Sequence, residues 1–161
     1  MRKNFKEFGS LGDWNKIDEK TDVSIVKQMD ETCVSAVGEM LAEYYGLKIT
    51  QAEILDEIGI LSNSTALAKF FNSKETENSV KWEGGGWQFE TPIGALKWLV
   101  ENYKIGAMLR NKSAKGHAVF IDGFDENGLV IVKDPFDQTV YKMKIENFSD
   151  VLSEFVWRKR K

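Results

Sequence analysis

The sequence contains one cysteine and one histidine, Cys33 and His117, and these two residue types form the catalytic pair of thiol hydrolases. A thiolate attacks the carbonyl carbon of an amide, and a neutral imidazole takes the thiol proton and later protonates the leaving amine. Because each type occurs once, no other cysteine or histidine competes for either role. The same scarcity excludes an intramolecular disulfide, a cysteine-only zinc site and a histidine-rich metal cluster. We therefore expect chemistry without a metal and without a cofactor.

Two aspartates compete to orient the imidazole. Asp134 follows the strand that is predicted to pair with the His117 strand, so the intervening turn returns it close to His117. Asp122 lies five residues along the His117 strand, which places it on the opposite face and roughly 16 Å away at the rise of a strand. We favour Asp134. The alternative interpretation of this residue is a turn-forming aspartate before Pro135.

The residues around Cys33 predict the first turn of a helix. Apolar side chains recur at steps of three and four from Cys33 to Tyr44. Thr32 is a candidate N-cap and Gly46 a candidate stop. The helix N-terminus favours an anion, so a thiolate there is stabilised and its pKa falls. Gln28 shortly precedes the cysteine, and its side-chain amide is the candidate second donor of an oxyanion hole, beside the Cys33 backbone N–H.

Simpler interpretations exist for both single residues. Cys33 would then be a small buried hydrophobe on a helix face, and His117 a hydrogen-bonded structural residue at a strand end. Their order along the chain favours a cysteine hydrolase assembled from two half-domains.

The elements that must position these residues predict an α+β fold, with helices first and an antiparallel sheet after them. Further helices are expected after caps at Thr50, Ser64 and Thr91. A flexible turn is expected at 83–87, and its flanking Trp82 and Trp87 either rim a groove or pack in the core. The expected strands are 105–109, 117–124, 129–133, 139–144 and 155–158, with a hairpin turn at 125–128 and a short helix at 145–152. We expect a single domain over 1–161, with an irregular lead-in over 1–22.

Composition excludes several functional classes. The 161 residues carry a net charge of -3, which disfavours a generally basic nucleic-acid binder. No apolar stretch is long enough to span a bilayer. The N-terminal residues lack the apolar region and cleavage site of a signal peptide. We therefore expect either a cytoplasmic protein or one delivered to a target cell as part of a larger secreted chain.

Two regions of the chain carry a resemblance to a known family: one consists of Gln28–Ala36, Met40–Leu41 and Tyr44–Gly46, and the other of Gly116–Phe124, Asn127–Gly128 and Val132–Phe136. Together they resemble the papain-like cysteine peptidases of the C39-like branch. It implies a papain-like fold, with an N-terminal helical lobe that carries the nucleophile and a C-terminal sheet that carries the base. Cys33 then corresponds to the nucleophile, His117 to the general base, Asp134 to the orienting residue and Gln28 to the oxyanion donor. Gln28 and Cys33 are one residue closer together than in many members.

A narrower resemblance links the chain to papain-fold toxin domains of bacterial polymorphic and contact-dependent toxins, which Tyr141–Met143 fits. It implies a protein or peptide substrate and a cognate immunity protein. Several functions stay open: a peptidase, a protein glutamine deamidase on the same residues, an acyltransferase in which an amine replaces water, and a peptide-binding module without catalysis. Peptidase and deamidase pass through the same acyl-enzyme, so the catalytic residues alone do not separate them.

Overall fold

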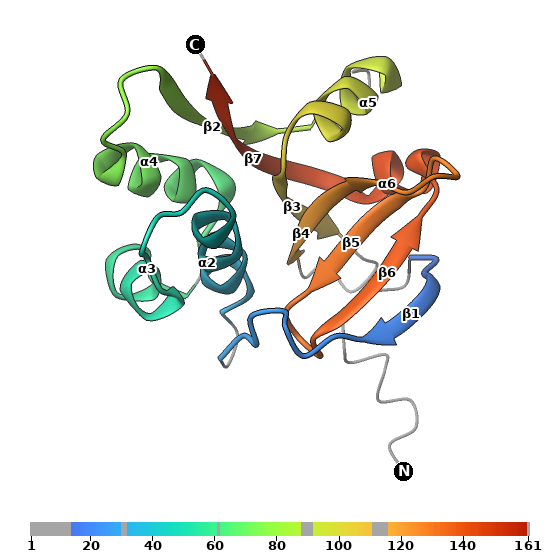
Figure 1. Ribbon diagram of the computed structural model, residues 1–161, viewed down its shortest axis with the longest axis horizontal. Coiled ribbons are helices and arrows are strands. Elements are labelled where there is room, and N and C mark those ends of the chain that lie inside the picture. The colour runs from blue at the N-terminus through green and yellow to red at the C-terminus, as the bar shows by residue number, and fades with distance from the viewer. Residues whose placement is uncertain (1–13, 30–31, 61, 88–91, 111–115, 161) are drawn as a thin grey trace.

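The computed structural model describes residues 14–29, 32–60, 62–87, 92–110 and 116–160, which form a strongly curved antiparallel sheet with helices packed on both of its faces (Figure 1). In chain order the elements are β1 (Ile17–Thr21), α2 (Cys33–Tyr44), α3 (Gln51–Ile58), α4 (Ser64–Lys74), β2 (Val80–Gly86), α5 (Ile93–Asn102), β3 (Ile105–Arg110), β4 (Gly116–Phe124), β5 (Val130–Asp134), β6 (Thr139–Met143), α6 (Ile145–Val151) and β7 (Leu152–Arg160). The strand order is β1-β6-β5-β4-β3-β7-β2. The predicted α+β class is confirmed.

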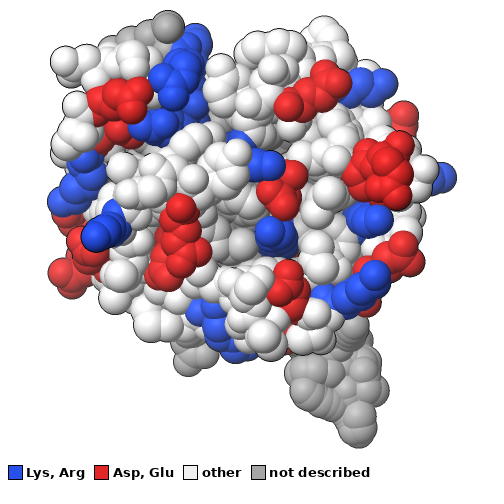
Figure 2. Space-filling model, viewed as in Figure 1, with Lys and Arg blue, Asp and Glu red and all other residues white. Residues whose placement is uncertain are grey.

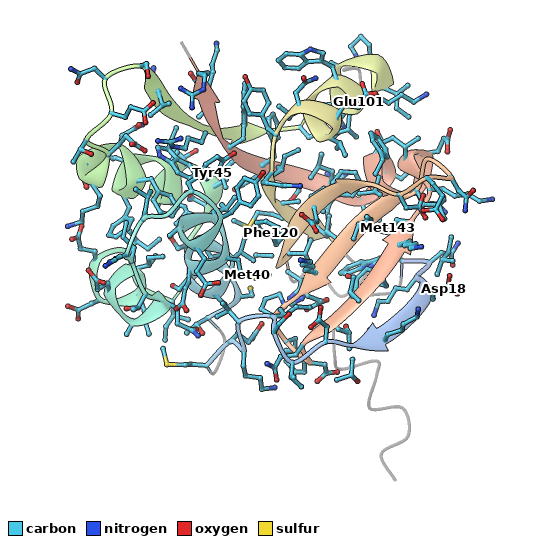
Figure 3. The ribbon with its side chains drawn as sticks, viewed as in Figure 1. Asp18, Met40, Tyr45, Glu101, Phe120 and Met143 are labelled. Atoms are coloured by element: carbon cyan, nitrogen blue, oxygen red, sulfur yellow. The ribbon has the colours of Figure 1, made fainter. Side chains whose placement is uncertain are left out.

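Helices α2, α3 and α4 gather into one lobe, while β3 to β6 with α5 and α6 form the other (Figure 1). The interface between the lobes is apolar. Met40 of α2 and Phe120 of β4 lie between the helices and the sheet (Figure 3), and both are buried. Gly106 of β3 makes close approach possible, because a Cβ there would lie 3.1 Å from Val37 and 3.2 Å from Leu41, both on α2. The helix that begins at Cys33 therefore packs directly on the sheet.

Alternation along β4 sorts its residues between two cores. Ala118 and Phe120 face the helical lobe, whereas Val119 and Ile121 face the core of the sheet lobe. His117 has the same parity as Val119, as expected for a strand with a side-chain period of two. At the start of β4, the side chain of His117 therefore faces the sheet lobe, and that of its neighbour Ala118 faces the helical lobe.

Local signals place most helix ends correctly. The Thr50 capping box of α3 is present, because Thr50 Oγ1 accepts from Glu53 N while the Glu53 carboxylate accepts from Thr50 N. The expected cap at Ser64 is off by one residue, since Asn63 accepts from Ala66 N and Ser64 is already helical. Helix α5 begins just after Pro92, and Thr91 lies outside the described residues.

The expectation of an irregular lead-in over 1–22 is wrong for Ile17–Thr21, and 1–13 lie outside the described residues. This segment is strand β1, which pairs antiparallel with β6 at the sheet edge (Figure 1). The segment lacks the apolar pattern of a buried strand because four of its five residues are polar, as an edge strand tolerates. The pairing places Trp14, which precedes β1, in the core of the sheet lobe.

The expected flexible turn at 83–87 is also wrong, because 83–86 belong to strand β2, which pairs with β7. Gly84 allows β2 to pack closely against the start of α4. A Cβ on Gly84 would lie 2.4 Å from the Ser64 carbonyl oxygen at the start of α4, whereas a Cβ on Gly85 would meet nothing within 4 Å. Trp82 and Trp87 are core residues: Trp82 stacks on Phe71, and the ring of Trp87 meets Phe155 edge-on. The groove-rim alternative for these two residues is discarded.

Charge is distributed evenly over the face shown in Figure 2, where acidic and basic side chains are interspersed rather than gathered by sign. Among the described residues, none of the helices combines the length and the hydropathy needed to cross a membrane.

Candidate active site

Cys33 is the first residue of α2, as its sequence context predicts, and its side chain is half-buried. Its Sγ atom accepts a hydrogen bond from the backbone N–H of Ala118 at 3.4 Å. Thr32 occupies the N-cap position but makes no side-chain cap bond to α2. Its hydroxyl donates instead to the carbonyl of Met29 and to Gln51 Oε1. Among the residues that the structure describes, no side-chain cap neutralises the N-terminal dipole of α2, which favours an anionic sulfur at Cys33.

His117 and Asp134 form a buried pair on the inner face of the sheet. His117 Nε2 lies 2.7 Å from Asp134 Oδ1, and both side chains are almost fully excluded from solvent. The register explains the contact. Ile121 of β4 pairs with Val132 of β5. His117 lies four residues before Ile121 and Asp134 two residues after Val132, so in this antiparallel pair both lie towards the same end and on the same face of the sheet. Since Nε2 bonds Asp134, Nδ1 is the ring nitrogen left for the Cys33 thiol.

Asp134 is held by two further donors. The backbone N–H of Phe136 donates to Oδ1 at 3.0 Å, and the hydroxyl of Tyr141 donates to Oδ2 at 3.1 Å. Burial and the charge of Asp134 both raise the pKa of Tyr141 well above its ordinary value, so Tyr141 stays a neutral donor. The carboxylate is thereby fixed with one oxygen on His117 and the other on Tyr141.

Trp14 covers this pair, a contact that the sequence does not reveal. Its ring stacks on His117 with centroids 6.4 Å apart and an interplanar angle of 18°. Its Nε1–H donates to the Tyr141 hydroxyl at 3.2 Å. Trp14 is only 7% exposed, so it screens the histidine–aspartate pair from water. Trp14 reaches His117 only through the pairing of β1 with β6, and neither Trp14 nor Tyr141 lies in a local motif that signals this contact.

The two titrating groups shift in opposite directions. Burial by itself disfavours the thiolate, but hydrogen bonding to His117, its positive charge and the Ala118 N–H outweigh burial and lower the pKa of Cys33. Burial likewise disfavours the imidazolium, yet the Asp134 charge and the hydrogen bonds to Asp134 and Cys33 raise the pKa of His117 to about 10. Both shifts therefore favour a thiolate–imidazolium pair over a neutral thiol and imidazole. Such a pair supplies a nucleophile and a general acid together.

Gln28 lies beside the turn that follows Asp134. Its backbone N–H donates to the Pro135 carbonyl at 3.0 Å. Its side-chain Oε1 is buried and has no hydrogen-bond partner within the described residues. The structure thus places the Gln28 backbone against the Asp134 turn, a few residues before Cys33 along the same connecting segment.

Asp122, the rival carboxylate, lies elsewhere. It forms ion pairs with Lys104 at 2.9 Å and Lys133 at 3.2 Å, on the face of β4 opposite to His117. Among the described residues, no three of the side chains of histidine, cysteine, aspartate or glutamate lie together as a metal would require.

Comparisons with known proteins point in the same direction. The model of the Peptidase_C39 like family matches residues 20–161. A relative named Cysteine protease effector 1, from Escherichia coli O1:K1:H7, is 34% identical over 147 residues. That match covers 90% of this chain but 28% of the relative, so the chain spans little more than a quarter of that protein's length.

Two solved structures share the fold. One is a double glycine motif protease from an AMS/PCAT transporter in complex with the leader peptide, with a TM-score of 0.63 and 16% identity; 93% of this chain and 97% of that chain are covered. The other is the peptidase domain of Streptococcus ComA, a bi-functional ABC transporter involved in a quorum sensing pathway, with a TM-score of 0.60 and 18% identity; the coverage is 84% and 97%. At these identities the likeness concerns the fold alone.

Proposed function

The chain belongs to the Peptidase_C39 like family of papain-like cysteine peptidases, and we propose that Cys33 is the nucleophile with which it hydrolyses peptide bonds. One observation carries the assignment of the residues. His117 is hydrogen-bonded to the Asp134 carboxylate, and the Cys33 thiol accepts from the backbone N–H of Ala118, the residue next to His117, with the pKa of the thiol lowered and that of the imidazole raised. A cysteine that served only as a packing residue would have no need of this arrangement.

The proposed reaction begins with attack of the Cys33 thiolate on the scissile carbonyl carbon. The tetrahedral oxyanion accepts hydrogen bonds from the Cys33 backbone N–H and from the Gln28 side-chain amide. As the C–N bond breaks, the His117 imidazolium gives its proton to the leaving amine, and a thioester remains on Cys33. Neutral His117 then removes a proton from water, and the resulting hydroxide attacks the thioester. Collapse of the second intermediate releases the acid and regenerates the thiolate–imidazolium pair.

Asp134, Tyr141 and Trp14 support this cycle without touching the substrate. Asp134 accepts from His117 Nε2, so Nδ1 is the nitrogen that exchanges protons with sulfur and with the leaving group. Tyr141 fixes the second carboxylate oxygen. Trp14 excludes water from the pair, which strengthens the electrostatic coupling between Asp134 and His117.

We further infer that the substrate is a protein of a target cell. The support is the 34% identity to a protein named as a cysteine protease effector, together with a shared fold in which another protease holds a leader peptide. A cell that makes such an enzyme needs protection from it, so we propose a cognate immunity protein that covers Cys33. Both proposals concern the partner, and the chemistry at Cys33 does not depend on them.

The experiment is a comparison of wild type with Cys33→Ala and His117→Ala in a bacterial lysate. Newly formed protein N-termini are counted by mass spectrometry, and released ammonia is measured in the same samples. We expect new N-termini with the wild type and none above background with either variant. Asp122→Asn serves as a matched control, because it alters a carboxylate on the same strand but the opposite face. Ammonia release without new N-termini would replace the peptidase with a deamidase, and transfer of an added amine would indicate an acyltransferase.

A further inference from the structure

The segment that carries Gln28 runs between the two lobes, from β1 to α2 (Figure 1). On the sheet side it is held by the turn after β5. Gln28 N donates to Pro135 O, and Lys27 Nζ donates to Phe136 O at 2.7 Å. Gln138 Nε2 donates to Ile25 O at 2.8 Å. One side of the segment is therefore fixed to the loop that positions Asp134.

On the helical side, Ile25 packs in the core of the helical lobe, and the side chain of Gln51 hydrogen-bonds to the backbone of the segment. Gln51 Nε2 donates to the Lys27 carbonyl at 2.7 Å, and Gln51 Oε1 accepts from the Met29 backbone N–H at 3.2 Å. The same oxygen accepts from the Thr32 hydroxyl at 3.1 Å. A single amide thus joins the peptide group before Gln28 to the peptide group after it.

This pairing has a geometric consequence. The Lys27 carbonyl and the Gln28 N–H belong to one peptide plane, and the Met29 N–H belongs to the next. Fixing both planes fixes the backbone dihedrals at Gln28, because a residue has only two soft backbone dihedrals. The direction in which the Gln28 side chain leaves the backbone is then set by Gln51.

Gln51 is itself firmly placed. It is the first residue of α3, whose capping box is complete, and its backbone N–H donates to Glu39 Oε1 of α2 at 2.6 Å. Glu39 lies on α2, the helix that begins with Cys33. Gln51 therefore fixes the Gln28 segment relative to the helix that carries the nucleophile.

We propose that Gln51 is a positioning residue for the oxyanion hole, acting through the backbone on either side of Gln28. This inference rests on the proposed role of Gln28 as oxyanion donor. A donor must lie within hydrogen-bond distance of the developing oxyanion, and a misplacement of about 1 Å costs on the order of 100-fold in rate. Loss of the Gln51 amide frees the dihedrals at Gln28 and removes this precision, while the Cys33–His117–Asp134 arrangement stays in place.

The test compares two reactions of Cys33. Acylation by p-nitrophenyl acetate passes through a tetrahedral oxyanion, whereas alkylation by iodoacetamide is a direct displacement that forms none. We expect Gln51→Ala and the isosteric Gln51→Met to slow acylation by about 10- to 100-fold. The alkylation rate and its pH profile are expected to stay within about twofold of wild type, because the thiolate–imidazolium pair is untouched. Cys33→Ala supplies the background for acylation.

Controls separate positioning from loss of structure. Glu53→Ala breaks the capping box of α3 but leaves the Gln51 side chain in place, so it should lower stability without lowering acylation selectively. If Gln28→Ala slows acylation as Gln51→Ala does, the double variant should be no slower than Gln28→Ala alone. Thermal melting identifies any variant that has lost its fold, and the isosteric Gln51→Met stands in for Gln51→Ala in that case.

The outcomes distinguish two failures. If Gln28→Ala slows acylation but both Gln51 variants do not, or if they slow acylation and alkylation equally, the positioning role of Gln51 is overturned. If Gln28→Ala leaves acylation unchanged, the oxyanion role in the proposed function fails first, and the role of Gln51 fails with it.

Discussion

His117 Nε2 lies 2.7 Å from Asp134 Oδ1, and the two side chains are only 2% and 1% exposed. Burial of an imidazole normally lowers its pKa, yet here the aspartate charge reverses that effect and the pKa of His117 rises to about 10. The pair therefore decides the protonation state of the site, because a histidine that stays charged at neutral pH stabilises the Cys33 thiolate beside it.

Replacing Asp134 with asparagine should lower the pKa of His117 by roughly one to three units, since an adjacent opposite charge raises an imidazole pKa by that amount. His117 is the only histidine, so its ring resonance can be followed by NMR titration of the untagged protein without ambiguity. Asp122→Asn, on the opposite face, should leave the titration unchanged. A wild-type midpoint near the ordinary value of 6.5 would contradict the proposed coupling.

Replacing Tyr141 with phenylalanine should destabilise the protein by about 1–3 kcal/mol, the cost of leaving buried polar groups without partners. The variant removes the donor to Asp134 Oδ2 and the acceptor of Trp14 Nε1. Urea unfolding measures the loss, and hydrolysis should slow because the carboxylate is less firmly oriented. Tyr44→Phe removes the same hydroxyl from a side chain that is 56% exposed, and it should change neither quantity. Equal effects of the two substitutions would show that the Tyr141 hydroxyl has no special role.

The two neighbouring glycines of β2 should respond differently to alanine. A Cβ on Gly84 would lie 2.4 Å from the Ser64 carbonyl oxygen, so Gly84→Ala must displace α4 from the sheet and should cost about 1–3 kcal/mol. Gly85→Ala meets nothing within 4 Å and should be neutral or slightly stabilising, because alanine restricts the unfolded chain. The melting temperatures of both variants, each compared with that of the wild type, test this prediction. A greater loss for Gly85→Ala would show that the packing of α4 on β2 is not as described.

An acid-sensitive ion pair fastens α4 to β7. Arg158 donates from Nε and Nη2 to the two carboxylate oxygens of Glu75, and Trp82 Nε1 donates to the same group. Hydrogen bonding to Arg158 is the main reason that the pKa of Glu75 lies at about 2 instead of 4.5. A lowered carboxylate pKa stabilises the fold above pH 4.5, and this stabilisation is lost as the pH falls towards 2.

Glu75→Gln should therefore lower the free energy of unfolding by about 3 kcal/mol at pH 7, and the difference from wild type should vanish near pH 2. Urea unfolding across that range tests the prediction. Glu77→Gln removes a more exposed carboxylate that also contacts Arg158 and should have a much smaller effect. A loss for Glu75→Gln that does not depend on pH would show that the charge is not responsible.

Local patterns predict the contact between His117 and Asp134. The lone cysteine at a helix start, the lone histidine at a strand start and the turn at 125–128 together predicted which aspartate returns to His117, and the contact is present. These inferences succeed because strand alternation and hairpin pairing are short-range geometry. The α+β arrangement followed from the same patterns.

Other parts depend on contacts between distant segments and could not be predicted in this way. Trp14 reaches His117 only because β1 joins the sheet more than a hundred residues from its partner strand β6. Gln51 occupies an ordinary helix start, and nothing in its neighbours signals that its side chain holds the Gln28 segment. The three glycines of β2 favour a turn in the sequence, because the close packing of Gly84 on α4 is visible only in three dimensions.

The central claim is that His117 holds Cys33 as a thiolate, and the ultraviolet absorbance of the thiolate tests it without any substrate. Cys33 is the only cysteine, so the signal that is absent from Cys33→Ala belongs to this residue alone. We predict that the wild-type thiolate forms below pH 9, the ordinary value of a thiol, and that His117→Ala raises the pH at which it forms, because burial is then opposed only by the Ala118 N–H. A wild-type thiol that titrates at or above pH 9, unchanged by His117→Ala, would contradict the account.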